Sequence, residues 1–219
     1  GLMNAVVALF IYGLVPEFLM RFLAWLLVSA VYRVRSDGLD HVPDTGPCIV
    51  VCNHVSYADA VVIAACLARP VRFVMDHRIF GMPILSFIFR TLRTIPIAPA
   101  KVDAAMKAKA YDDVAAALAA GEVVGIFPEG RLTTDGELRE FRPGVQEIVA
   151  RTPVPVIPMA LTGLWGSFFS RAGEGGRPMR RLRGIFSPIA LVVGAPIPPG
   201  EATPARLRAA VLALRGGAS

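Results

Sequence analysis

Few residues in this chain can take up and release a proton in a reaction, and one of them, a histidine, follows an apolar run of strand character. The chain has three histidines. His54 comes directly after Cys48–Cys52, an apolar run typical of a buried strand, and Asp59 follows five residues later. A carboxylate that accepts from one imidazole nitrogen fixes the tautomer and leaves the other nitrogen as a general base. The pair predicts acid–base catalysis, with local capping of a helix as the alternative.

The spacing of His54 and Asp59 limits where each of them can lie. On a single helix, five residues turn the chain so that the two side chains lie roughly 140° apart. They can face each other only if His54 lies in the turn after the strand and Asp59 in the first turn of the next helix. We therefore expect a strand over 48–52, a turn, and a helix over 59–67.

A second polar group follows another apolar run, Val123–Phe127. Pro128 and Gly130 predict a turn at this point, which would expose Glu129 and Arg131. The guanidinium of Arg131 suits a phosphate, because it can donate two parallel hydrogen bonds. Glu129 could orient Arg131 or accept from a polyol hydroxyl. An ordinary ion pair in a loop is the alternative reading.

The elements that must position these motifs alternate between strand and helix. Strands are expected over 48–52, 71–75, 94–97, 123–127, 154–161 and 185–193, and helices over 59–67, 79–92, 102–120, 143–150 and 204–215. This alternation predicts an α/β domain with a mostly parallel central sheet flanked by helices. Open sheets of this class place their sites at the carboxyl ends of the strands, which is where both polar groups lie.

The N-terminal segment is almost wholly apolar and predicts a membrane anchor over residues 1–33, followed by a catalytic domain over 34–219. Each apolar half, 2–15 and 18–32, is shorter than the roughly 20 residues that cross a bilayer core. Two helices joined near residues 13–16 could lie in one leaflet as a hairpin, and one kinked helix could instead span the membrane. A pair of buried core helices is the alternative.

Composition narrows the class of partner. Hydrophobic residues make up 54% of the chain, the formal net charge is +6, and the mean hydropathy is +0.55. These values favour an anionic membrane surface or anionic substrates. Nucleic acid is not expected, because no RNP-type stretch and no zinc-finger spacing occur. Three cysteines without a CxxC spacing argue against a disulfide framework or a zinc site and favour a reducing compartment.

Together the two motifs resemble those of the glycerolipid acyltransferase family, which includes bacterial lysophosphatidic acid acyltransferases. That family carries Asn-His, four residues and Asp, which correspond to Asn53, His54 and Asp59, and Phe-Pro-Glu-Gly, which corresponds to 127–130. The resemblance covers roughly 34–199, including an apolar block with an internal proline at residues 156–160.

One block of the family departs from its usual pattern in this chain. The arginine that usually follows an apolar strand is replaced by Pro99, which leaves Lys101 as the candidate cation for the lipid headgroup. The segments 72–80 and 95–101 look most like the branch that reacylates lysophospholipids, such as 2-acylglycerophosphoethanolamine acyltransferase. In that branch the domain is fused in some proteins to a lysophospholipid transporter, and the same arrangement is an expectation for this chain.

The resemblance implies both a reaction and roles for the site residues. His54 would be the catalytic base and Asp59 would orient it, while the substrate would be bound by Asn53, Glu129, Gly130, Arg131 and Lys101. A fatty acyl group would pass from a thioester of coenzyme A or acyl carrier protein to the free hydroxyl of a lysophospholipid, without a cofactor or metal. The absence of a Gly-x-Ser-x-Gly elbow in the sequence is consistent with direct attack.

Several alternatives stay open at the level of the sequence. The acceptor could be 1-acylglycerol-3-phosphate, which would make the product phosphatidic acid. The chain could also be a lipid hydrolase, or a membrane-binding module without activity. The arginine-rich segment 171–183 predicts a loop that could bind headgroups, coenzyme phosphates or an acidic carrier protein. The expected location is the cytoplasmic face of a bacterial inner membrane.

Overall fold

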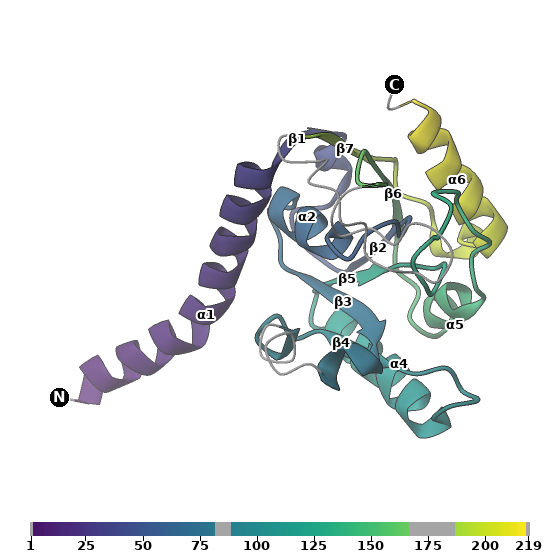
Figure 1. Cartoon of the computed structure of the whole chain (residues 1–219). Helices are drawn as coiled ribbons and strands as arrows, with labels where there is room; N and C mark the ends of the chain where they lie inside the picture. Colours follow the sequence, from purple (N-terminus) through teal and green to yellow (C-terminus); the bar gives the residue numbers. More distant parts are fainter. Residues whose placement is uncertain (1, 82–88, 167–186, 218–219) are drawn as a thin grey trace.

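The computed structural model describes residues 2–81, 89–166 and 187–217, and its centre is a seven-stranded sheet (Figure 1). The strand order is β1-β7-β6-β2-β5-β3-β4. The bounds are β1 Tyr32–Asp37, β2 Cys48–Cys52, β3 Val71–Asp76, β4 Ile95–Ile97, β5 Val123–Ile126, β6 Val156–Thr162 and β7 Ser187–Val193. Neighbouring strands run parallel except β6 and β7, which run antiparallel. The prediction of an α/β fold with a mostly parallel sheet is confirmed.

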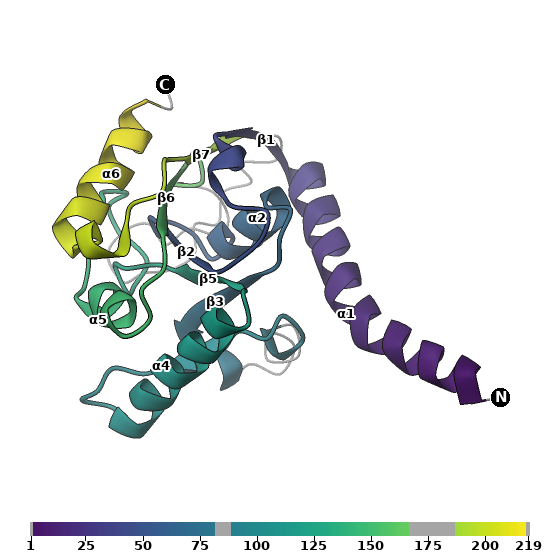
Figure 2. The same cartoon turned by 180° about the vertical axis from the view of Figure 1, so that it is seen from behind.

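Helices cover both faces of this sheet (Figures 1 and 2). Their bounds are α1 Leu2–Val31, α2 Asp59–Cys66, α4 Ala104–Ala119, α5 Gly144–Arg151 and α6 Pro204–Gly216, with short 3-10 helices η1 Leu39–His41, η2 His77–Gly81 and η3 Pro199–Glu201. Side chains of α1 and α2 share one hydrophobic core with the sheet, and side chains of α4, α5 and α6 share the other. The sheet is therefore a middle layer between two cores.

Strand β2 lies at the centre of the sheet, and this position explains why its sequence is wholly apolar. All five of its residues are buried. Cys48, Val50 and Cys52 face the core of α2, while Ile49 and Val51 face the core of α4, α5 and α6. A strand that is buried on both faces needs an unbroken apolar run rather than an alternating one. Cys48 and Cys52 are free thiols and serve as small core residues.

Helix α1 is continuous, which corrects one reading of the sequence. The hairpin of two helices joined near residues 13–16 does not form, because the helix runs unbroken from Leu2 to Val31. Arg21 fixes its second half to the domain by donating to the carbonyl oxygens of Leu67 (3.0 Å) and Ala68 (2.7 Å) at the end of α2. In both views the first half of α1 extends away from the sheet (Figures 1 and 2).

The reading of α1 as a buried core helix is also wrong where its side chains are described. Large apolar side chains between residues 19 and 27 are exposed, whereas Val28 is buried. Across the described part of the chain, no helix has both the length and the apolar character that crossing a bilayer would require. Contact between α1 and a membrane stays a prediction.

Other differences from the expected elements are local. Strand β1 was not expected, because its sequence Tyr-Arg-Val-Arg-Ser-Asp is too polar to resemble a buried strand. It can be polar because it lies at the edge of the sheet, beside β7 alone. The helix expected over 79–92 is described only at its ends, where 79–81 belong to η2 and 89–91 are helical. The predicted loop 171–183 lies outside the described residues.

Candidate active site

The chain leaves β2 through a turn that Asn53 anchors to the neighbouring strand β6. Asn53 is buried, and its side-chain oxygen accepts from the backbone N–H of Leu161 at 2.8 Å while its Nδ2 donates to the carbonyl oxygen of Leu161 at 2.9 Å. Both polar atoms of the Asn53 amide are therefore bonded to the backbone of Leu161. The polar atoms of Asn53 are turned toward β6, where they hold the turn that carries His54. A contact between Asn53 and substrate stays a prediction.

His54 and Asp59 face each other across this turn, as their spacing predicted. Nδ1 of His54 lies 2.9 Å from Oδ2 of Asp59, which is the first residue of α2 and is fully buried. The same Oδ2 accepts from the backbone N–H groups of Val55 (2.7 Å) and Ser56 (2.9 Å). An oxygen that already accepts two N–H donors acts as an acceptor toward the imidazole as well. Nδ1 therefore carries the proton, and Nε2 is left as the basic nitrogen.

The face of the imidazole ring is held by an aromatic stack. The ring of His54 lies 4.2 Å from that of Phe127, centroid to centroid and nearly parallel, and Phe127 in turn stacks on Phe73 at 5.8 Å. Gly125 makes room for this stack, because a Cβ at that position would lie 2.5 Å from the ring of Phe73. The orientation of His54 thus depends on a hydrogen bond at one edge of the ring and on stacking at one face. The His54 side chain is still 22% exposed.

Glu129 joins the turn after β5 to the turn after β2. It is buried, and its two oxygens accept from the backbone N–H groups of His54 (2.7 Å) and Arg139 (3.0 Å). Burial raises the pKa of this carboxyl, and the two hydrogen bonds partly oppose that rise. Both oxygens of Glu129 accept from backbone donors, which gives this residue a positioning role. A contact between Glu129 and substrate stays a prediction.

Gly130 and Arg131 complete the second turn. Gly130 has a φ of +68°, its N–H donates to the carbonyl oxygen of Phe127 at 3.0 Å, and a Cβ on it would lie 2.7 Å from Nε of Arg142. The backbone conformation therefore favours glycine, and a Cβ would also require the Arg142 side chain to move. Arg131 follows in an exposed position with no ion pair to the residues that the structure describes. Thr133 donates its N–H to the carbonyl oxygen of His54 at 3.0 Å, which keeps this segment beside the histidine.

Lys101 lies apart from this group. It is exposed in the turn between β4 and α4, at the same edge of the sheet as His54. Strands β5 and β3 separate β4 from β2, and three strand spacings amount to about 14 Å. The structure therefore brings His54, Asp59 and the turn 127–131 together, and it leaves Lys101 at the margin of the site.

Several residues that shape the site were not found from the sequence. Phe73 reads as an ordinary core residue, and Leu161, Thr133 and Arg139 act through backbone groups, which leave no signature in residue type. Gly125, a glycine inside an expected strand, was a possible signal of a close approach, and the structure places it opposite Phe73. Within the described ranges, no group of three metal-binding side chains occurs.

Comparison with known proteins gives relatives that include 1-acyl-sn-glycerol-3-phosphate acyltransferases. Over 160 residues the chain is 27% identical to the chloroplastic 1-acyl-sn-glycerol-3-phosphate acyltransferase BAT2 of Brassica napus. The aligned region covers 73% of this chain and 45% of the relative. A 1-acyl-sn-glycerol-3-phosphate acyltransferase of Borreliella burgdorferi is 22% identical over 137 residues, or 63% of this chain and 53% of the relative. The chain thus spans about half the length of these relatives.

The fold is also similar to a solved structure. The crystal structure of the 1-acyl-sn-glycerophosphate (LPA) acyltransferase PlsC from Thermotoga maritima superposes with a TM-score of 0.70, at 21% sequence identity, over 90% of this chain and 76% of that one. The model of the acyltransferase family matches residues 33–162, which include both motifs and the strands that position them. With more than half of its length matched in this way, the chain belongs to the acyltransferase family.

Proposed function

We propose that this protein transfers a fatty acyl group from a thioester to the free hydroxyl of a lysophospholipid. The observation that carries the proposal is the His54–Asp59 pair, in which Nδ1 is held at 2.9 Å and Nε2 is left as the base. The pair lies at the carboxyl edge of the sheet of an acyltransferase family member. An imidazole held in one tautomer is suited to remove a proton from an alcohol near neutral pH.

The reaction would proceed by direct attack. Nε2 of His54 removes the proton from the hydroxyl, and the oxygen attacks the carbonyl carbon of the thioester. The carbon–sulfur bond breaks, the thiolate leaves, and the imidazolium returns the proton to the sulfur. Asp59 stabilises the imidazolium, since its buried carboxylate lies against Nδ1. Phe127 and Glu129 keep the ring and its backbone in place.

We propose a lysophosphatidic acid as the acceptor, because the relatives named above act on 1-acyl-sn-glycerol-3-phosphate. Arg131 is the candidate for its phosphate, as an exposed guanidinium without an ion pair in the described structure and on a segment bonded to His54. Lysophosphatidylethanolamine is the second candidate. It is favoured by one observation, the proline at position 99 where the family usually has an arginine.

The donor would be an acyl thioester of coenzyme A or of acyl carrier protein, used as a co-substrate. We further propose that α1 contacts the lipid surface. Leu19, Phe22, Leu23 and Leu26 are spaced at three and four residues and are all exposed, so they form an apolar stripe on one side of the helix. The proposed location is the cytoplasmic face of a bacterial inner membrane, for which free cysteines are suitable. Coupling to a lysophospholipid transporter also stays a proposal.

An acceptor assay tests this proposal. The full chain is incubated with a labelled acyl thioester and with lysophosphatidic acid, lysophosphatidylethanolamine or no lipid acceptor, in mixed micelles. We expect labelled phosphatidic acid as the main product, and we expect Arg131→Gln to raise the KM for lysophosphatidic acid about tenfold or more. Arg206→Gln on α6, another exposed arginine, serves as the control and should leave that KM unchanged.

The other outcomes of this assay are equally informative. A main product from lysophosphatidylethanolamine would exclude the preferred acceptor and support the second candidate. Labelled fatty acid released at the same rate with and without acceptor would identify a hydrolase. A chain that binds lipid and produces neither product would be a binding module, and the proposed reaction would be abandoned.

A further inference from the structure

Arg142 lies against the turn that carries Glu129 and Gly130, although it belongs to a later segment of the chain. Its backbone N–H donates to the carbonyl oxygen of Pro128 at 2.9 Å. A Cβ on Gly130 would lie 2.7 Å from Nε, 2.8 Å from Cζ and 2.9 Å from Cδ of Arg142. The guanidinium therefore lies directly over Gly130, in the space that a glycine leaves empty. Because Glu129 accepts from the N–H of His54, this guanidinium lies beside the proposed catalytic turn.

The side chain of Arg142 differs from those of three other arginines in this region. Arg139, Arg208 and Arg215 donate from their side chains to oxygens of the loop 134–139, at distances between 2.9 and 3.2 Å. These three arginines hold the loop in its conformation. The side chain of Arg142 is exposed and has no hydrogen bond or ion pair to any residue that the structure describes. It is therefore available to a ligand.

Arg131 adds a second guanidinium at the same place. It follows Gly130 in the chain, so the Cα atoms of these two residues are about 3.8 Å apart. Its side chain is also exposed, without an ion pair in the described ranges. The carboxylate of this turn, that of Glu129, accepts from backbone N–H groups with both oxygens and forms no ion pair with either arginine. The two positive charges beside Gly130 therefore suit an anion.

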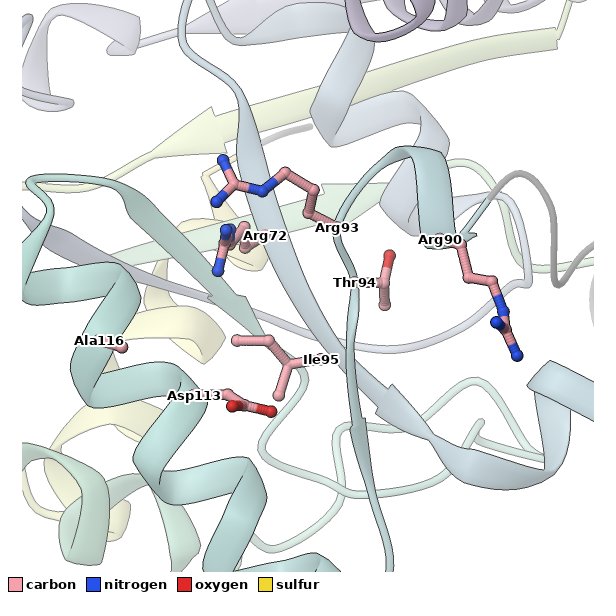
Figure 3. A pocket seen from close by; sticks show the side chains of 7 residues that line it. All are labelled: Arg72, Arg90, Arg93, Thr94, Ile95, Asp113 and Ala116. Carbon is pink, nitrogen blue, oxygen red and sulfur yellow. The ribbon is translucent and has the colours of Figure 1, made fainter. Parts of the chain in front are cut away.

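Arginines at the β3–β4 edge of the sheet do not have this property. Arg72 and Arg93 line the pocket that Figure 3 shows, and both of them pair with Glu122. Their positive charges are already shared with a carboxylate of the protein. Arg131 and Arg142 have no such carboxylate among the described residues, and they lie on segments that are bonded to the proposed catalytic turn.

We propose that Arg142 acts with Arg131 to bind the phosphate monoester of the acceptor lipid and so determines which lysophospholipid is used. This inference rests on the proposed function, in which the acceptor is a lysophosphatidic acid. A phosphate monoester carries a charge of about −1.5 to −2 near neutral pH and offers three terminal oxygens. Two guanidinium groups match it, because each can donate two parallel hydrogen bonds. The phosphodiester of lysophosphatidylethanolamine has fewer free oxygens and less charge, so it gains less from the second arginine.

Equilibrium binding of lysophosphatidic acid to the full chain, in mixed micelles and without an acyl thioester, tests this role. We expect Arg142→Gln to weaken binding about tenfold or more, because charge-assisted hydrogen bonds are lost. Arg142→Lys should be intermediate, since it keeps the charge but loses the planar fork. Arg206→Gln, at an exposed position of α6, is the control and should bind as the unmodified protein does. Thermal unfolding without lipid should be the same for all four proteins.

Two further comparisons separate a shared phosphate site from a general attraction of charges. Binding of lysophosphatidylethanolamine should weaken only about threefold or less in Arg142→Gln, because a general charge effect is small at an exposed site. In a double-mutant cycle with Arg131→Gln, the two losses should not be additive, since both side chains bind one phosphate. Losses that multiply in the double variant would overturn the shared site.

The inference is also overturned if Arg142→Gln binds lysophosphatidic acid as tightly as Arg206→Gln does, if it weakens the binding of both lipids equally, or if the unmodified protein does not bind lysophosphatidic acid. Failure of the proposed reaction gives a different result. In that case no acylated product forms, but Arg142→Gln still weakens the binding of lysophosphatidic acid. Failure of the inference alone would leave product formation in place without an effect of Arg142 on binding.

Discussion

A single oxygen, Oδ2 of Asp59, organises the chemistry at the scale of residues. It accepts from His54 and from two backbone N–H groups in the turn before α2. The alternative from the sequence, a histidine that caps the helix, is not what the structure shows, because α2 has no side-chain cap and His54 bonds to Asp59 instead. The turn geometry and the tautomer of His54 are therefore set together.

Replacing Asp59 with asparagine tests the contribution of its negative charge to catalysis while its size is kept. Asp59→Asn keeps the volume but removes the negative charge that stabilises the imidazolium, and a neutral amide oxygen is a weaker acceptor for three donors. We expect kcat to fall about 10²- to 10⁴-fold, with little change in the KM for the lysophospholipid. Steady-state kinetics provide the measurement, and thermal unfolding shows whether the variant is folded. A folded variant with unchanged kcat would contradict the role of Asp59.

Glu129 leads to a prediction about stability and pH. Burial raises the pKa of its carboxyl, so the folded state binds the proton more tightly than the unfolded state does. The stabilisation from the protonated form is then present in acid and is lost as pH rises through the raised pKa. Urea unfolding from pH 4 to 7 should therefore show the unmodified protein losing stability relative to Glu129→Gln as pH increases. A constant difference between the two proteins over this range would argue against the raised pKa.

The sequence predicted these residues better than it predicted their partners. His54 and Asp59 were found because spacing and strand exit depend only on residue type and order. Asn53 and Glu129 were expected to touch substrate, and the structure shows instead how each of them is bonded to the backbone. Their partners are backbone groups of Leu161, His54 and Arg139, and contacts of that kind become visible only once the strands are paired.

At the scale of elements, three neighbouring strands contribute to the orientation of one imidazole. β2 leads into His54, β5 leads into Phe127, and β3 supplies Phe73. The stack depends on Gly125 of β5, which leaves space for the ring of its partner Phe73. A substitution in β3 should therefore change the orientation of His54 through Phe127, although the two do not touch.

Substituting Phe73 tests this connection. Phe73→Leu keeps an apolar side chain but removes the ring that supports Phe127. We expect kcat to fall about two- to tenfold, which corresponds to an aromatic pair worth about 0.5–1.5 kcal/mol. Leu118→Ala, a fully buried cavity variant in α4 on the other face, is the control. It should destabilise the fold and leave the kcat of the folded protein unchanged. Equal kcat losses in both variants would contradict a specific role for the stack.

The elements were predicted where their apolar patterns are strong. Strand β2 and helix α4 lie close to their expected ranges because a doubly buried strand and a capped, alanine-rich helix have clear signatures. Strand β1 was missed because an edge strand tolerates charge. The continuity of α1 was not resolved, because Pro16 ends some helices and only bends others. The antiparallel pairing of β6 and β7 depends on the route of the chain between them.

At the scale of the whole molecule, α1 stands out from an otherwise layered domain (Figure 1). Its exposed stripe includes Leu19, Phe22, Leu23 and Leu26, and Trp25 and Leu27 add further exposed apolar surface. The basic composition of the chain is compatible with anionic lipid near this helix. The class of fold and the two motifs were predictable from sequence, and the exposed apolar side chains of α1 are compatible with the predicted anchor, whose contact with a membrane stays a prediction.

Flotation with vesicles measures this proposed contact. The unmodified chain should bind vesicles that contain an anionic phospholipid. The double variant Phe22→Glu and Leu26→Glu should bind at least about tenfold more weakly, because each substitution removes buried apolar area and adds a charge that lipid disfavours. Leu212→Glu on α6, where the leucine is also exposed, is the matched control and should bind normally. Equal binding by all three proteins would rule out α1 as the lipid contact.

The most direct test of the central claim is the rate of acyl transfer after removal of the His54 imidazole. Transfer from a labelled acyl thioester to lysophosphatidic acid is measured for the full chain, for His54→Ala and for His41→Ala. His41 is a suitable control because its ring bonds to the carbonyl oxygen of Val193, away from the site. We expect His54→Ala to lose transfer by about 10³-fold or more while it still binds vesicles, and we expect His41→Ala to keep its activity. A folded His54→Ala protein that transfers acyl groups at the unmodified rate would contradict it.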